Sequence, residues 1–140
     1  MTEAMGTEAM GTEAMGVIYT TIKLRNPMTA DAPIDVEAKV DNGATLLVLP
    51  GSIAHHFNLP VIRKQNVKYA NETVEEQDIV GVVEVEVCGR KGWFEAIVEP
   101  AKKYALLGAV VMESLDLIIE PRSLGIYPNP RSALPMAEIE

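Results

Sequence analysis

Asp41 is the residue whose surroundings in this sequence best suit acid–base chemistry. It begins the stretch Asp41-Asn42-Gly43-Ala44 and follows residues 34–40, where apolar and polar side chains alternate. The alternation predicts a strand with one buried face, and Asn42 and Gly43 tolerate the backbone angles of a turn after it. A carboxylate held where a strand ends in a turn is a candidate catalytic acid or base.

The same residues have a purely structural interpretation. Asn-Gly is a strong signal for a two-residue hairpin turn, and the apolar run 46–49 would supply the second strand of such a hairpin. Taken alone, the local pattern favours the hairpin. The choice therefore depends on the rest of the chain.

Several segments together resemble the retroviral-type (retropepsin-like) aspartic proteases. Asp-Xaa-Gly-Ala after an alternating strand is similar to the active-site segment of that family. Ala105-Leu106-Leu107-Gly108-Ala109 is similar to its hydrophobic-hydrophobic-Gly element, and residues 110–115 to the short helix that follows. Residues 83–98 look like the hairpin that comes after the flap. The ordered set covers roughly Val17 to Pro128.

The resemblance implies an all-β fold: a small closed acid-protease barrel with a flap hairpin, one short helix near the C-terminal end and an active site at a homodimer interface. In such a fold Asp41 is the catalytic residue. The loop that carries it is shaped by Asn42, Gly43 and Ala44. Leu107 and Gly108 form a structural loop beside it, where Gly permits close backbone passage.

Residues 67–74 alternate around Ala70 and Asn71, which predicts a projecting hairpin. An ordinary surface hairpin explains the pattern. By position, however, the segment corresponds to the flap that covers substrate in the retropepsin-like family. The residues then expected to bind substrate are Tyr69, Ala70, Asn71 and Glu72. The tip lacks the glycines common among viral members.

Position 42 departs from the family pattern, which has Thr or Ser after the catalytic Asp. That hydroxyl bonds across the dimer, whereas the Asn42 amide is longer and can both donate and accept. The first hypothesis is a homodimeric aspartic endopeptidase that hydrolyses peptides or unfolded protein with a pair of Asp41 carboxylates. The alternative is a catalytically silent dimerisation or peptide-binding module of the same fold. A third, an unrelated small β-barrel, is disfavoured by the downstream Leu-Leu-Gly.

Length and composition predict one domain. The chain has 140 residues, of which 48% are hydrophobic, enough for one modest core. We expect the domain to span residues 17–128, followed by a loose tail over 129–140. Residues 1–16 repeat Thr-Glu-Ala-Met-Gly, a period that fits neither helix nor strand, so we expect a disordered tract. A tag, an expanded repeat or a self-processing site would each account for it.

Charge and composition also exclude several partners. A net charge of −8 with scattered Lys and Arg argues against nucleic acid. No apolar run is long enough for a membrane span and no secretion signal is evident, so we expect a cytoplasmic protein without membrane contact. The lone Cys88 cannot form an internal disulfide.

Four other residues are candidates for special roles. His55 and His56 are adjacent, so they point in different directions, and no third ligand accompanies them; we expect neither metal nor cofactor. Cys88 is expected on a strand beside a turn at residues 89–92. Trp93 is expected in the core or an interface rather than as a substrate platform.

Overall fold

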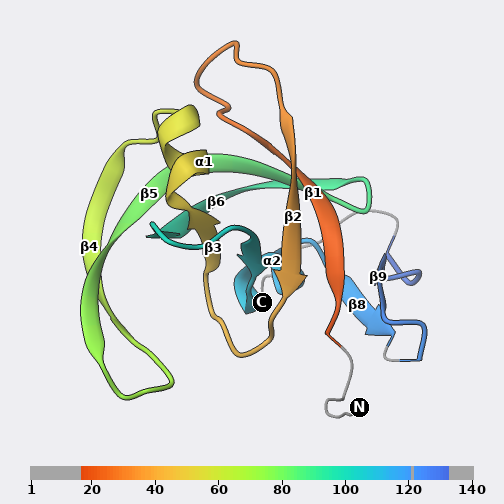
Figure 1. Cartoon of the computed structure of the whole chain (residues 1–140). Helices are drawn as coiled ribbons and strands as arrows, with labels where there is room; N and C mark the ends of the chain where they lie inside the picture. Colours follow the sequence, from red (N-terminus) through yellow and green to blue (C-terminus); the bar gives the residue numbers. More distant parts are fainter. Residues whose placement is uncertain (1–16, 121, 133–140) are drawn as a thin grey trace, which may run out of the picture.

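A computed structural model describes residues 17–120 and 122–132 of the chain (Figure 1). The described part is mostly β-structure with two short helices. The elements are β1 (Tyr19–Arg25), β2 (Ile34–Val40), β3 (Leu47–Pro50), α1 (Gly51–His56), β4 (Val61–Lys68), β5 (Val74–Val87), β6 (Arg90–Glu99), β7 (Ala105–Leu107), α2 (Ala109–Ser114), β8 (Leu117–Glu120) and β9 (Gly125–Pro128). The repeat at 1–16 and the tail from 133 lie outside the described residues.

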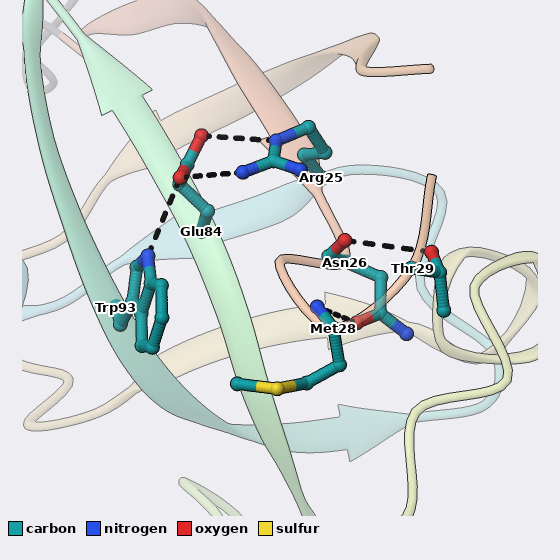
Figure 2. Close-up of polar contacts among 6 residues, drawn as sticks. All are labelled: Arg25, Asn26, Met28, Thr29, Glu84 and Trp93. Carbon is teal, nitrogen blue, oxygen red and sulfur yellow. Dashed lines mark hydrogen bonds and ion pairs between the residues drawn. The ribbon is translucent and has the colours of Figure 1, made fainter. Parts of the chain in front are cut away.

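Six strands close into a barrel in the order β1-β2-β7-β3-β6-β5, and β5 returns to β1. Arg25 and Glu84 are partners in that closing register. The guanidinium of Arg25 donates to both carboxylate oxygens of Glu84, with Nη2 at 3.0 Å and Nε at 3.3 Å, and Trp93 Nε1 donates to the same carboxylate (Figure 2). A bidentate ion pair therefore spans the seam where the barrel closes.

The barrel interior is filled by the apolar phase of alternating strands. Along β5, Val83, Val85 and Val87 are buried, while Glu84 and Glu86 between them are partly exposed. Burying each such side chain contributes about 1.5–3 kcal/mol. Strand β2 covers residues 34–40 as its alternation predicts.

Two short helices flank the barrel, one more than the fold prediction specified. Helix α2 is the expected helix near the C-terminal end. Helix α1 begins directly after Pro50 and buries Ala54. None of the helices in the described segments is long and apolar enough to cross a membrane.

The turn between β5 and β6 begins one residue earlier than predicted and is only two residues long. Cys88 and Gly89 form it, with φ of +53° and +80° respectively. Positive φ at both central residues is typical of the two-residue hairpin turns whose twist matches the strands. Cys88 is thus an exposed turn residue, and Arg90 already belongs to β6.

Trp93 is not a core residue, since 56% of its surface is exposed. Gly92 and Trp93 are in opposite phase along β6, and Phe94 takes the buried position beside Trp93. The indole lies on the outer face next to the Arg25–Glu84 pair, as Figure 2 shows.

The segment after α2 forms a separate two-stranded sheet, β8–β9. Buried Arg90 ties this segment to the barrel, because its guanidinium donates to the carbonyl oxygens of Leu115 and Asp116 at 3.0 Å and of Asn129 at 3.2 Å. Ser132, the last described residue, also accepts from Arg90. The first four residues of the predicted tail therefore have a defined anchor.

Candidate active site

Asp41 follows β2 directly and is held by the neighbouring strand β7. Its backbone N–H donates to the carbonyl oxygen of Leu107 at 3.0 Å, which extends the parallel β2–β7 ladder. The preceding N–H, from Val40, donates to Ile18 O at 2.8 Å. The main chain is thus fixed on both sides of β2 at the point where the carboxylate leaves it.

The side chain of Asp41 closes its own turn. Oδ1 accepts the backbone N–H of Gly43 at 2.9 Å, and Ala44 N–H donates to the Asp41 carbonyl at 3.1 Å. A β-carbon added to Gly43 would stand 3.2 Å from Oδ1, closer than nearly all such contacts. The absence of a side chain at residue 43 therefore lets its backbone N–H approach the Asp41 carboxylate. Asp41 itself is half-buried.

The simple hairpin interpretation of Asp41-Asn42-Gly43 is wrong. Strands β2 and β3 are not hydrogen-bonded to each other, because β7 lies between them in the sheet. The turn instead carries the chain from one side of β7 to the other. Strand β2 pairs with β7 in parallel, and β3 pairs with β7 in the antiparallel sense.

Gly108 brings the start of α2 against the loop after Asp41. A β-carbon there would stand 2.5 Å from Leu46 O and 2.8 Å from both Ala44 O and Thr45 O. The first N–H groups of α2 use these carbonyls: Ala109 donates to Ala44 O at 2.8 Å and Val110 to Thr45 O at 3.0 Å. Backbone N–H groups of the helix that lack an intrahelical partner thereby hold the loop that follows Asp41.

A groove of about 690 Å³ opens beside Asp41. The β4–β5 hairpin curls round so that its tip lies at the same end of the barrel as the β2–β3 loop (Figure 1). The groove is lined by residues 41 and 43–46 from the loop, residues 65–70 from the hairpin, Val48, Ile97, Glu99 and Leu106 from the barrel wall, and Lys102 from the loop after β6.

The tip of the hairpin is a compact turn from Tyr69 to Thr73. Tyr69 N–H donates to Thr73 O at 2.9 Å, and Glu72, with φ of +71°, donates its N–H to Tyr69 O at 2.9 Å. Asn71 Oδ1 accepts the N–H of Thr73 at 3.1 Å and its hydroxyl at 2.6 Å. Lys68 pairs with Glu72 at 3.2 Å. The tip is ordered by its own contacts without glycine.

Some of the predicted site residues line the groove, and others lie outside it. Asp41, Gly43, Ala44, Tyr69 and Ala70 all line the groove. The lining does not include Asn42, Asn71 or Glu72, all of which are exposed. Leu107 and Gly108 lie behind the loop rather than on the groove.

Among the groove residues that the sequence analysis does not predict are two charged ones, Glu99 and Lys102. Glu99 accepts a hydrogen bond from the hydroxyl of Tyr69 and lies on the same face of β6 as Ile97. Lys102 Nζ lies 5.4 Å from the ring centroid of Tyr104. The alternation of β6 could have placed Glu99 beside Ile97, but only the curl of the hairpin brings Tyr69 to it.

His55 and His56 lie on α1, away from the groove lining, and the His56 ring packs edge-on against Phe57 with 4.8 Å between centroids. Within residues 17–120 and 122–132, no cluster of three or more His, Cys, Asp or Glu residues could hold a metal ion. The groove lining includes the carboxylates of Asp41 and Glu99, the hydroxyl of Tyr69 and the side chains of Lys68 and Lys102.

Neither the known family models nor the curated proteins match this sequence. Solved structures do. The EIAV protease bound to an inhibitor aligns with a TM-score of 0.53 at 16% identity, covering 71% of this chain and 88% of its own. A retropepsin-like aspartic protease from Rickettsia conorii aligns with a TM-score of 0.50 at 18% identity, covering 75% and 77%.

A simian foamy virus (mac) protease aligns less well, with a TM-score of 0.47 at 22% identity over 66% of this chain and 91% of its own. The two better alignments establish the fold. This chain has the fold of the retropepsin-like aspartic proteases, so the predicted all-β closed barrel is confirmed.

Proposed function

We propose that this chain is a homodimeric aspartic endopeptidase in which the Asp41 residues of two subunits form the catalytic pair. The observation that carries the proposal is the Asp41 turn: in a retropepsin-like fold, it places a half-buried carboxylate on a groove under a hairpin. The groove suits an extended peptide bound as an added strand, with the β4–β5 hairpin as the flap.

A second subunit is required by the chemistry. Peptide hydrolysis needs a base to activate water and an acid to assist the carbonyl, and one carboxylate cannot be both at once. Two Asp41 side chains at close range cannot both ionise, so they share a proton. The ionised carboxylate then takes a proton from the attacking water, while the protonated one hydrogen-bonds the scissile carbonyl oxygen.

Asn42 supports a second candidate, a silent dimerisation or peptide-binding module. The residue is exposed beside Asp41, where the resemblance calls for a Thr or Ser hydroxyl that bonds to the opposite loop. An amide of different reach weakens that network unless the partner loop adapts. This module would bind peptides in the same groove without cleaving them.

Cleavage assays with matched Asp variants separate these functions. The full chain is incubated with an unfolded protein between about pH 4 and 7, with and without an aspartic-protease inhibitor, beside Asp41→Asn. The control is Asp35→Asn, which removes a carboxylate from the other end of β2, where Asp35 pairs with Lys23 in solvent.

We expect inhibitor-sensitive cleavage by the wild type and by Asp35→Asn, and none by Asp41→Asn. Sedimentation should show a dimer in all three proteins. Cleavage that survives Asp41→Asn, or cleavage by a protein that stays monomeric, would falsify the shared pair. A dimer that binds peptide but never cleaves it would identify the silent module.

A further inference from the structure

Tyr69 connects the tip of the β4–β5 hairpin to the barrel wall. Its hydroxyl donates to Glu99 Oε2, thirty positions along the chain at the end of β6. The same hydroxyl oxygen accepts from Gln77 Nε2 at 2.9 Å, within the hairpin. The hydroxyl therefore both donates and accepts a hydrogen bond. The bond that it donates, to Glu99, connects the hairpin to β6.

The outer part of the hairpin has little other support from the sheet. Strand β4 is the last strand of its sheet, and β5 pairs with β6 only from Ile79 onward. Between the base and the tip of the hairpin, β4 and β5 pair only with each other, and no other described strand pairs with them there. The Arg63–Glu95 ion pair, 2.5 Å, ties the base to β6. At the tip, the hydrogen bond from Tyr69 to Glu99 ties the hairpin to β6.

The surroundings keep the tyrosine a hydrogen-bond donor. Burial, and then the hydrogen bond to Glu99, raise the pKa of the Tyr69 hydroxyl, so it keeps its proton at neutral pH. The two nearby ammonium groups are engaged elsewhere: Lys68 with Glu72, and Lys102 over the Tyr104 ring. Neither of these two ammonium groups therefore competes with the Tyr69 hydroxyl for the Glu99 carboxylate.

We propose that Tyr69 and Glu99 are positioning residues that latch the flap over the groove. Both line the groove, so their hydrogen bond sets how far the tip stands from the floor around Asp41. A peptide can enter only after the bond opens, and its re-formation holds the tip on the bound strand. The effect on substrate rests on the proposed protease function, whereas the latch itself does not.

Hydrogen exchange of the full chain tests the latch without activity. Amide exchange at residues 69–73 is followed in the wild type, Tyr69→Phe, Glu99→Leu and the double variant. Tyr104→Phe is the control, because it deletes a hydroxyl from a half-buried ring at the same end of the barrel. Glu99→Gln keeps an acceptor oxygen, so it should rescue much of the latch.

We expect tip exchange to quicken on the order of tenfold in both single variants, because a hydrogen bond to a charged group is lost. The double variant should exchange no faster than either single one, and Tyr104→Phe should match the wild type. Unchanged exchange in the barrel strands β1 and β2 verifies folding. Unchanged tip exchange in both single variants, or effects that multiply in the double variant, would overturn the latch.

Peptide kinetics supply the link to function. With the latch open, KM should rise severalfold while kcat stays close to that of the wild type, because the flap holds the peptide and does not touch the reacting bond. A fall in kcat with KM unchanged would contradict a positioning role. If no variant cleaves peptide while tip exchange follows the expected pattern, the protease proposal fails and the latch stands.

Discussion

The carbonyl oxygen of Ala44 lies 2.8 Å from where a β-carbon on Gly108 would stand, so two distant segments meet in direct backbone contact beside Asp41. The contact is reinforced by the hydrogen bond from Ala109 N–H to the same oxygen, also 2.8 Å. The position of the Asp41 carboxylate thus depends on the start of α2 as well as on its own turn.

Gly108→Ala should destabilise the protein by about 2–3 kcal/mol and greatly reduce cleavage, because the added methyl group must push three backbone carbonyls away. Urea unfolding measures the loss. Gly89→Asn is the control: nothing lies within 4 Å of its β-carbon position, and Asn tolerates the positive φ. Equal midpoints for wild type and Gly108→Ala would show that the loop is not held there.

Asn42→Thr should raise kcat/KM, because a hydroxyl at this position can restore the bond to the opposite loop that the resemblance implies. Stability should change by less than about 0.5 kcal/mol, since Asn42 is exposed. Peptide cleavage under steady-state conditions measures the gain, and the double variant with Asp41→Asn should be inactive. An unchanged or lower kcat/KM would show that position 42 does not limit activity.

Arg90→Met should cost about 3 kcal/mol of unfolding free energy. Arg90 is only 8% exposed, and removal of its guanidinium leaves the carbonyls of Leu115, Asp116 and Asn129 without this donor. Denaturant unfolding provides the measurement. Arg63→Met, whose pair with Glu95 is 45% and 41% exposed, should change stability by about 0–1 kcal/mol. Similar losses in both variants would argue against a special role for the buried arginine.

Glu84 gives the stability a defined pH dependence. The Arg25 hydrogen bond, chiefly, holds the pKa of the Glu84 carboxyl below its usual value. A lowered folded-state pKa means that the stabilisation is present above the unfolded pKa of about 4.3 and is lost as pH falls through the folded pKa. Glu84→Gln should therefore be less stable than wild type at pH 7, and this difference should shrink at pH 3.

Urea unfolding of both proteins at the two pH values measures that difference. Glu86→Gln, on the same face of β5, is the matched control, because no ion pair of Glu86 occurs among the described residues. A deficit in Glu84→Gln that is equally large at pH 3 would show that the lost interaction is not the ion pair.

Local periodicity predicted much of the barrel. The alternation over residues 34–40 marks β2 from end to end, and the polar run around Ala70 marks a hairpin, because neighbours two positions apart determine which face a strand buries. The predicted position of the turn before Arg90 is wrong because contacts far along the chain, not local periodicity, decide where Arg90 lies. An arginine next to a glycine indicates a loop, yet carbonyls from residues 115–129 make a buried position for it.

The sequence by itself determined the chemical types at the site: a carboxylate at Asp41, glycine where backbones touch at Gly108, and a family resemblance that the fold supports. Only the tertiary structure decided which groups meet. Barrel closure sets β7 between β2 and β3, and the curl of the hairpin joins Tyr69 to Glu99. Such contacts depend on the path of the whole chain, which no local pattern records.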